Sequence, residues 1–340
     1  LHKASRRQRQ MCIRDRTYCS IMRNILCVTL IALLGGCTST SVTEKYQDKR
    51  NDIINVKDKV IEFETGNVLI GSVSRLYMSN KCLLIADHKS VDKQIHIFNK
   101  NDFSYLTSIG NFGEGPEEIT VMGCLAIDEA HHQLYVSDHA KQKIFSYDMD
   151  SVMVDSLYKP QVKTAMNETL FPSEYQYIND TLSIAVLIKP TSTSTFNQFL
   201  GRWNMNTGEM IPMKYTHPDI QKKRITFAAS EKAGIYVECY TRHDLMTICS
   251  LDGELLYNIY GPDWDGGNGN KLQSFGTVMI GNDKIFVSYC GEDYARDSFP
   301  TKILVFDLEG NYLKTLETGY KISDCCYAVS YTHLTLPTNS

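Results

Sequence analysis

The sequence predicts an all-β fold built from repeats of about 50 residues, and two observations support this prediction. First, five polar turns, each directly after an apolar or aromatic segment, recur at spacings of 49, 56, 46 and 57 residues. Asn, Asp and Gly are frequent in these turns because they tolerate the left-handed backbone of a tight hairpin. Second, almost no window after Leu34 has helical periodicity, which argues against helical repeats. The turns occupy residues 98–102, 147–151, 203–208, 249–253 and 306–310.

Short apolar segments between these turns complete each repeat. Four strands in about 50 residues are typical of one blade of a β-propeller. Units centred near residues 87, 138, 185, 237 and 287 make five blades, and residues 321–328 start a sixth for which too little chain remains. We therefore expect a β-propeller of the six-bladed type with an incomplete last blade, in an open or strained ring, and a natural chain that continues. The alternation in residues 59–63 predicts a strand that completes the last blade.

One blade carries a more specific pattern. Residues 110–118, followed by the strands at 125–128, 134–138 and 143–148, resemble an NHL-type repeat, and residues 84–88 and 95–98 repeat part of it. The chain from about Phe63 resembles the six-bladed TolB-like propeller lipoproteins of Bacteroides and related bacteria. No repeat carries both the Gly-His and the Trp-Asp pair that mark WD40 repeats, and the kelch signature is absent.

The N-terminal part contains an export signal. Met22 and Arg23 precede residues 25–34, of which nine are apolar. Ten helical residues span about 15 Å, half of a bilayer core, so a signal peptide at 22–36 is favoured over a membrane anchor. The following Leu34-Gly35-Gly36-Cys37 resembles the lipobox of bacterial lipoproteins, which implies a lipid on Cys37 that holds the protein at the membrane. The alternative is a secretory signal followed by an ordinary cysteine.

These patterns divide the chain into five parts. We expect a non-native upstream segment, because Arg-rich residues precede a complete signal, and a non-native tail, because the end breaks the repeat. Small polar residues after Cys37 suit a flexible tether. The first acidic residue after that cysteine is Glu44, which favours a periplasm-facing protein over one displayed at the cell surface. The expected parts are residues 1–21 (upstream segment), 22–36 (signal), 37–52 (tether), 53–328 (propeller) and 329–340 (tail).

The charge distribution of the chain narrows its possible partners. Residues 1–36 hold seven of the 35 basic residues and one of the 39 acidic residues, so the remainder of the chain is acidic and unsuited to binding nucleic acid.

The cysteines predict free thiols. Four of the 11 cysteines lie at or before Cys37. An odd number follows, mostly in strand patterns, so we expect buried free thiols rather than a disulfide framework. These are Cys82, Cys124, Cys239, Cys249, Cys290, Cys325 and Cys326.

Six polar residues are candidates for binding. Asp87-His88 and Asp138-His139 recur at equivalent blade positions. Asp and His can bind metals, but an aspartate that ends a strand also caps the next turn, and this structural role is favoured. Asp263 and Asp265 begin a loop, residues 263–270, whose oxygen-rich and glycine-rich composition is typical of calcium loops. The loop fails the EF-hand pattern, so we predict no metal site.

The sequence contains no catalytic motif. A P-loop, a Gly-x-Ser-x-Gly elbow and a His-Glu-x-x-His pair are all absent, so no catalytic residue and no cofactor is predicted. Propeller loops and channels suit recognition. The favoured hypothesis is a non-catalytic binding or scaffold lipoprotein of the cell envelope, with a protein or glycan partner. The alternative, which the resemblance implies, is a lyase or lactonase that uses a divalent cation, such as calcium, at the central channel.

Overall fold

Antiparallel hairpins recur along the chain in the computed structural model, which describes residues 43–155, 157–220, 223–267, 272–293, 296, 298–328 and 334–335. The chain divides into residues 1–44 and residues 45–340, and every strand residue except Glu44 belongs to the second unit. The predicted upstream segment, the signal peptide, Cys37 and nearly all of the predicted tail lie outside the described residues. Among the residues described, no helix combines the length and the apolar character that crossing a bilayer requires.

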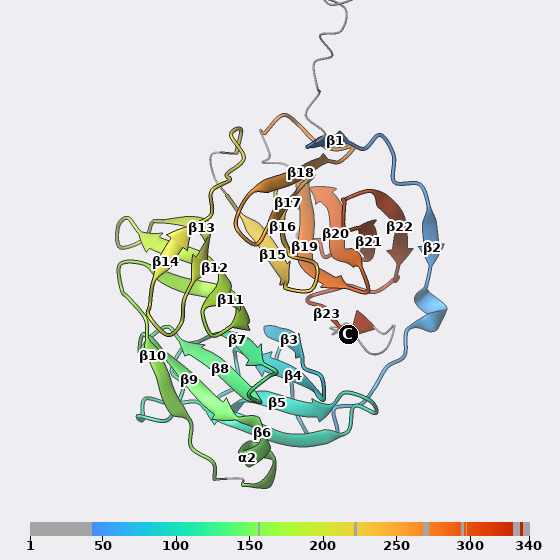
Figure 1. Cartoon of the computed structure of the whole chain (residues 1–340). Helices are drawn as coiled ribbons and strands as arrows, with labels where there is room; N and C mark the ends of the chain where they lie inside the picture. Colours follow the sequence, from blue (N-terminus) through green and yellow to red (C-terminus); the bar gives the residue numbers. More distant parts are fainter. Residues whose placement is uncertain are drawn as a thin grey trace, which may run out of the picture. The chain divides into compact units, whose positions relative to one another are not determined.

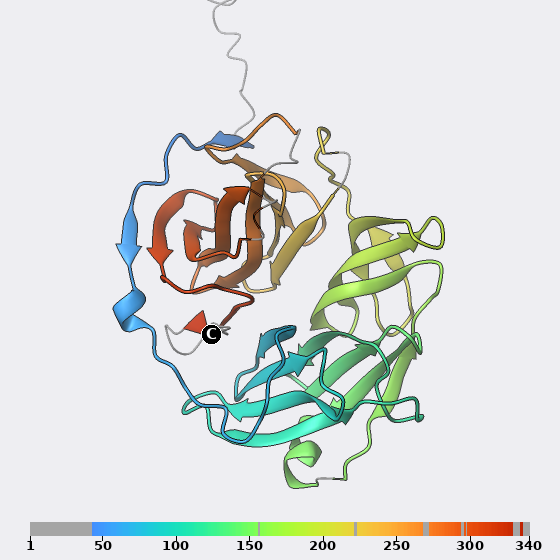
Figure 2. The same cartoon turned by 180° about the vertical axis from the view of Figure 1, so that it is seen from behind.

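Five blades of four consecutive antiparallel strands follow one another around a common axis (Figures 1 and 2). Blades 1, 2 and 3 consist of β3 (Ser74–Met78), β4 (Cys82–Asp87), β5 (Lys93–Asn99), β6 (Tyr105–Asn111), β7 (Met122–Asp128), β8 (Gln133–Asp138), β9 (Lys143–Asp148), β10 (Gln161–Ala165), β11 (Phe171–Asn179), β12 (Leu182–Pro190), β13 (Phe196–Trp203) and β14 (Met210–Pro212). Blades 4 and 5 consist of β15 (Ile225–Ser230), β16 (Ile235–Tyr240), β17 (Leu245–Ser250), β18 (Leu255–Tyr260), β19 (Leu272–Gly281), β20 (Lys284–Asp293), β21 (Lys302–Asp307) and β22 (Tyr312–Glu317). The predicted all-β propeller is confirmed.

The predicted turns join the third strand of each blade to the fourth, with one exception. Residues 98–102, 203–208, 249–253 and 306–310 form or adjoin such turns. In blade 2 the chain instead forms α2 (Met149–Val154), where the Asp148 side chain caps the helix by accepting a hydrogen bond from the Ser151 N–H at 2.7 Å. This helix is too short to give a helical stripe in the sequence, which is why periodicity missed it.

The apolar core is divided into clusters that lie between adjacent blades. One cluster joins blades 1 and 2 and others join blades 2 and 3, blades 3 and 4, and blades 4 and 5. Each sheet therefore buries its apolar faces against its neighbours, as the blades of a propeller do. All seven described cysteines are free and buried, which confirms that they act as small apolar side chains.

A short hairpin occupies the place of a sixth blade. It consists of β23 (Cys326–Tyr327) and β24 (Leu334–Thr335), and β23 contacts both β19 and β3, the innermost strands of blades 5 and 1. Ile322 and Cys325 pack against blade 5, while Cys326 packs against blade 1. The described chain thus has five complete blades and part of a sixth, in agreement with the expected incomplete blade.

The N-terminal segment follows the outer edges of blades 4 and 5. β1 (Glu44–Tyr46) adds to β18, and β2 (Ile53–Asn55) pairs in parallel with β22. The prediction that residues 59–63 complete the last blade is wrong. Lys59 ends the 3-10 helix η1 (Lys57–Lys59), and residues 60–63 form no strand. Alternating hydrophobicity indicates extended chain but does not identify the strand with which it pairs.

Candidate functional site

The carboxylates of Asp87 and Asp138 are engaged by backbone N–H groups. The Asp87 carboxylate accepts hydrogen bonds from Gly71 N at 2.7 Å and Lys89 N at 2.9 Å. A Cβ on Gly71 would lie only 2.8 Å from that carboxylate, so this approach requires glycine. The Asp138 carboxylate accepts hydrogen bonds from Thr120 N at 2.8 Å and from Ala140 N at 3.0 Å. Both aspartates therefore cap the turns that follow β4 and β8.

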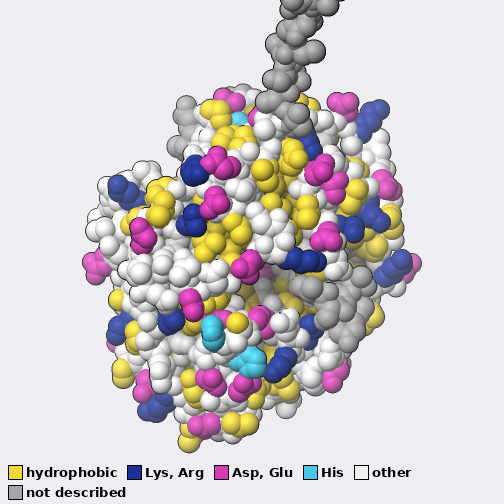
Figure 3. All heavy atoms as spheres, viewed as in Figure 1, with side chains coloured by type: hydrophobic (Ala, Val, Ile, Leu, Met, Phe, Trp, Pro, Cys, Tyr) yellow, Lys and Arg dark blue, Asp and Glu magenta, His cyan; other side chains and the backbone are white. Residues whose placement is uncertain are grey.

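The neighbouring histidines lie at the boundaries between blades. His88 Nδ1 is 3.2 Å from the carbonyl oxygen of Met122 in blade 2, and the His139 ring lies 5.9 Å from the Phe171 ring in blade 3. Burial lowers the pKa of both imidazoles below the usual histidine value, so the neutral form is favoured at pH 7. The Nε2 atoms of both are buried and have no hydrogen-bond partner among the described residues. Figure 3 shows histidine and acidic side chains gathered over blades 1 and 2 on the face viewed there.

The acidic loop after β18 uses its carboxylates within the fold. Asp263 accepts a hydrogen bond from the Tyr289 hydroxyl at 3.1 Å, and Asp265 lies 3.9 Å from Nδ1 of His243. The later part of the predicted calcium loop, residues 268–270, lies outside the described residues. The structure thus places the six predicted site residues in three separate turns. His88 and His139 lie close enough across the boundary between blades 1 and 2 for the charge of one to lower the pKa of the other, whereas Asp263 and Asp265 lie after blade 4. The six residues therefore do not form one site.

A cavity of about 370 Å³ opens between blades 1 and 2, away from the predicted site residues. This volume is within the range of small-ligand pockets. The β3–β4 and β7–β8 hairpins, strand β6 and helix α2 form its walls. Most of the wall is apolar because the inward-facing side chains of these elements belong to the core between the two blades. The apolar lining side chains are Leu84, Leu106, Ile127, Leu134, Met149 and Met153.

Polar side chains surround this apolar wall. Glu129 accepts a hydrogen bond from the backbone N–H of Asn80 at 2.7 Å, which connects the hairpins of the two blades. His132 Nδ1 lies 2.7 Å from an Asp150 carboxylate oxygen on α2. Asp128 and Lys81 also line the cavity, so the lining carries more acidic than basic side chains. The cavity therefore combines an apolar interior with an acidic rim.

Exposed apolar side chains continue from the cavity onto the surface. Leu106 and Met153 line the cavity and are 43% and 38% exposed, and Val154, next to Met153, is 87% exposed. A group of exposed apolar side chains beside a pocket is typical of an interaction site. The sequence does not predict this apolar surface, because Leu106 and Met153 belong to different repeats and line the same cavity only after folding.

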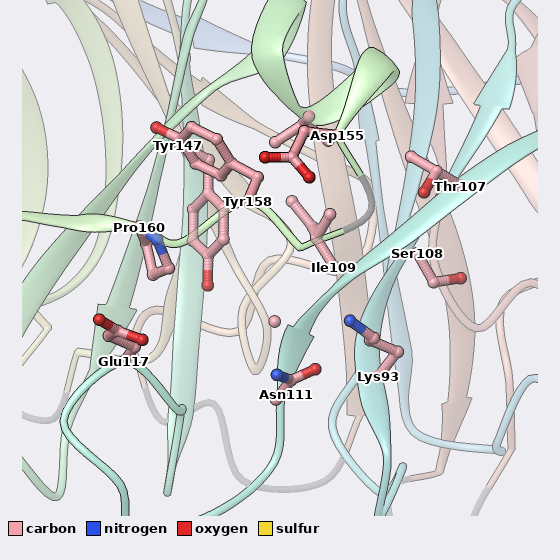
Figure 4. A pocket seen from close by; sticks show the side chains of 12 residues that line it. Lys93, Thr107, Ser108, Ile109, Asn111, Glu117, Tyr147, Asp155, Tyr158 and Pro160 are labelled. Carbon is pink, nitrogen blue, oxygen red and sulfur yellow. The ribbon is translucent and has the colours of Figure 1, made fainter.

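A second cavity, shown in Figure 4, lies between blade 1 and the chain that follows α2, and its volume is about 30 Å³. Such a volume holds about one water molecule. Glu117 and Asp155 lie at opposite sides of it (Figure 4). Burial raises the pKa of the adjacent Tyr147 hydroxyl, which keeps it protonated. The space is too small for an organic ligand, so the larger cavity is the candidate binding site.

Comparison with known proteins agrees with this fold. Residues 38–197 match the model of the family DUF5128, described as a 6-bladed β-propeller. The structure of a protein from Bacteroides fragilis, described as an exported protein, is similar with a TM-score of 0.50 and 14% identity, over 82% of this chain and 80% of that chain. A member of the DUF4221 family from Bacteroides vulgatus is similar with a TM-score of 0.48 and 10% identity, over 71% of this chain and 80% of that chain.

No curated protein matches the sequence. At 14% identity the Bacteroides fragilis structure supports the fold alone, and the family model supports the blade number over the first half of the propeller. The chain is therefore an all-β propeller of the six-bladed type that matches the DUF5128 model over residues 38–197.

Proposed function

We propose that this protein is a non-catalytic binding module, exported and anchored by a lipid, that recognises a protein partner through the cavity between blades 1 and 2. The observation that carries the proposal is the apolar cavity of about 370 Å³ with its acidic rim. An apolar side chain of the partner would fill the interior, and a neighbouring lysine or arginine would lie beside Glu129 and Asp150. Such an anchor in a pocket commonly supplies most of the binding energy of an interface.

The acidic rim favours a peptide segment over a neutral glycan. Glu129 and Asp150 attract a basic group, and the attraction acts mainly on association rate and specificity. The exposed apolar side chains Leu106, Met153 and Val154 add area around the cavity mouth, which a glycan with few apolar faces would leave uncovered. We therefore place protein partners before glycans.

This proposal predicts that charge at the cavity mouth abolishes peptide binding. Peptides would be selected from a random display library on the immobilised propeller, and the affinity of a selected peptide would be measured by calorimetry. We expect an apolar residue next to Lys or Arg in the selected peptides. Leu106→Glu should weaken binding at least tenfold, because a carboxylate then lies where an apolar side chain must enter.

Leu313→Glu is the matched control for this experiment. Leu313 lies on β22 of blade 5 and is 36% exposed, so its replacement adds the same charge to a partly exposed strand position distant from the cavity. Binding should be unchanged in this variant. Equal affinities for the wild type and Leu106→Glu, or selected peptides without an apolar and basic pair, would contradict the proposal.

The envelope location rests on the N-terminal pattern and on the exported Bacteroides fragilis protein to which the chain is similar. The resemblance of blade 2 to an NHL-type repeat and of the whole to TolB-like lipoproteins agrees with it. Cys37 would carry the lipid, with the propeller facing the periplasm. We expect Cys37→Ser to move the protein from the membrane fraction to the soluble fraction in a bacterial host that processes lipoproteins. Unchanged membrane association would contradict the anchor.

The alternative function, a divalent-metal enzyme with its site at the central channel, has less support. Asp87 and Asp138, the carboxylates that suggested it, accept hydrogen bonds from backbone N–H groups and fix the turns of their own blades. A carboxylate used in this way has fewer free lone pairs for a metal ion.

A further inference from the structure

Two hairpins of adjacent blades bring together three side chains. The proposed peptide recognition assigns no role to this group. Asp128 ends β7 and His131 lies in the β7–β8 hairpin of blade 2, while Asp180 lies in the β11–β12 hairpin of blade 3. One possible ligand atom of each residue lies within 4.8 Å of those of the other two. His131 Nδ1 and an Asp128 carboxylate oxygen are 2.8 Å apart. The group combines one imidazole nitrogen with two carboxylates.

This donor set suits a transition metal. Zn²⁺ takes imidazole nitrogen and carboxylate oxygen at about 2.0–2.2 Å, and three protein ligands leave a fourth position for water or another ligand. Ligand atoms around such an ion are closer together than 4.8 Å, so binding requires a small inward movement. His131 and Asp180 are exposed on hairpins and can make this movement without disturbing the core. Calcium is disfavoured because it takes six to eight oxygen ligands.

Asp128, the third ligand, is already held in place by the fold, and hydrogen bonds orient the carboxylates. Asp128 is only 2% exposed, and its carboxylate accepts a hydrogen bond from the Tyr135 hydroxyl at 3.3 Å. The Tyr177 hydroxyl donates to Asp180 at 2.7 Å. Hydrogen bonds from outer groups orient the ligands of metal sites in this way. A buried, oriented carboxylate beside two adjustable ligands is therefore a partly preorganised site.

We propose that Asp128, His131 and Asp180 bind one divalent transition-metal ion, with Zn²⁺ as the best fit, and that the ion links the first hairpins of blades 2 and 3. The ion would bind Nδ1 of the neutral imidazole in place of the proton that lies between His131 and Asp128. A neutral ring would then carry its single proton on Nε2, and a protonated ring would release one proton to the solvent. Asp128 also lines the cavity between blades 1 and 2, whereas His131 and Asp180 do not. Zinc binding can therefore be tested through His131 and Asp180 without altering the residues that line the cavity. The proposal also revises the prediction from sequence that the chain has no metal site.

The test uses the intact chain, treated with a chelator, dialysed and titrated with zinc chloride in a calorimeter. We expect saturation at one tight site per chain and a higher melting temperature with zinc, because an ion that binds the folded state stabilises it. His131→Ala and Asp180→Asn should each weaken binding at least tenfold. Both side chains are exposed, so circular dichroism should show an intact fold.

Asp283→Asn is the control for Asp180→Asn. Asp283 occupies the corresponding first hairpin of blade 5 and lies 3.6 Å from Lys232 in an exposed ion pair, so its loss removes the same charge elsewhere. The affinity and stoichiometry of this variant should equal those of the wild type. Absence of zinc binding, or equal binding by the wild type and His131→Ala, would overturn the proposal.

Discussion

Replacing Arg50 by alanine is expected to lower the free energy of unfolding by about 3–5 kcal/mol, the cost of leaving a buried charge without its partner. Arg50 lies between β1 and β2, and its guanidinium is 2.8 Å from the Asp244 carboxylate. The two side chains are only 8% and 0% exposed. Burial raises the pKa of Asp244, and the arginine opposes this effect. Without Arg50 the carboxylate would have to be buried unpaired or take up a proton.

Arg50 also contacts blade 5, which adds to the expected loss. Its guanidinium carbon lies 5.3 Å from the centroid of the Tyr289 ring and 5.7 Å from those of Phe275 and Phe306. A cation over aromatic rings contributes about 0.5–2 kcal/mol, more when water is excluded. Since Asp244 belongs to blade 4 and the rings belong to blade 5, Arg50 links the two blades from the N-terminal segment.

Urea unfolding of the wild type and variants would measure this effect. Arg202→Ala is the control, because Arg202 pairs with Asp252 at 3.1 Å on the surface, where such a pair contributes about 0–1 kcal/mol. Arg50→Met combined with Asp244→Asn should recover part of the loss, because neither charge then remains buried. A loss in Arg50→Ala no larger than that in Arg202→Ala would contradict the interpretation.

Replacing Asp324 by alanine should give the second largest loss, about 3 kcal/mol, because two hydrogen bonds to a buried carboxylate disappear. Asp324 precedes β23 and accepts hydrogen bonds from Leu76 N on β3 at 2.8 Å and from the Thr277 hydroxyl on β19 at 2.6 Å. It thereby connects blade 5 to blade 1 at the place of the incomplete sixth blade. Asp324→Asn should lose less, since its oxygen still accepts one hydrogen bond and the Thr277 hydroxyl can accept one from its amide.

The pH dependence of stability distinguishes the wild type from Asp324→Asn. Burial raises the pKa of Asp324 above its usual value of 3.8. A carboxyl group whose pKa is higher in the folded state favours folding in its protonated form, so its contribution is full below about pH 3.8 and declines as the pH rises through the raised value. The wild type should therefore gain stability relative to Asp324→Asn as the pH falls from 7 towards 4. Urea midpoints in that range would show it, and a difference independent of pH would contradict the assignment.

The polar residues beside the turns show how far sequence reasoning reached. Asp87 and Asp138 were predicted to cap turns, and they do, because the hydrogen bonds are made within a few residues or to the preceding segment of the same blade. The Asp128, His131 and Asp180 group was missed. Its only signals were a histidine in one first hairpin and an aspartate in the same hairpin of the next blade, which become neighbours only when the blades pack.

The residues before the first blade show most clearly what local sequence patterns cannot predict. Small and polar composition assigned residues 37–52 to a flexible tether, yet within that range Tyr46 stacks on Tyr260 at 4.5 Å and Arg50 is buried against Asp244. No local pattern distinguishes an arginine that will be buried from one that will be solvated. The difference depends on a carboxylate almost 200 residues later in the sequence.

The all-β class, the blade period, the turns and the free cysteines could be predicted without the structure, because they follow from hydrophobic alternation and turn residues within a few positions of each other. Three features became visible only in the folded protein: which strands the N-terminal segment joins, how Asp324 connects blade 5 to blade 1, and where the cavity and the Asp128, His131 and Asp180 group lie. These features depend on contacts between side chains that are distant in sequence, and packing of neighbouring sheets, not local propensity, brings them together.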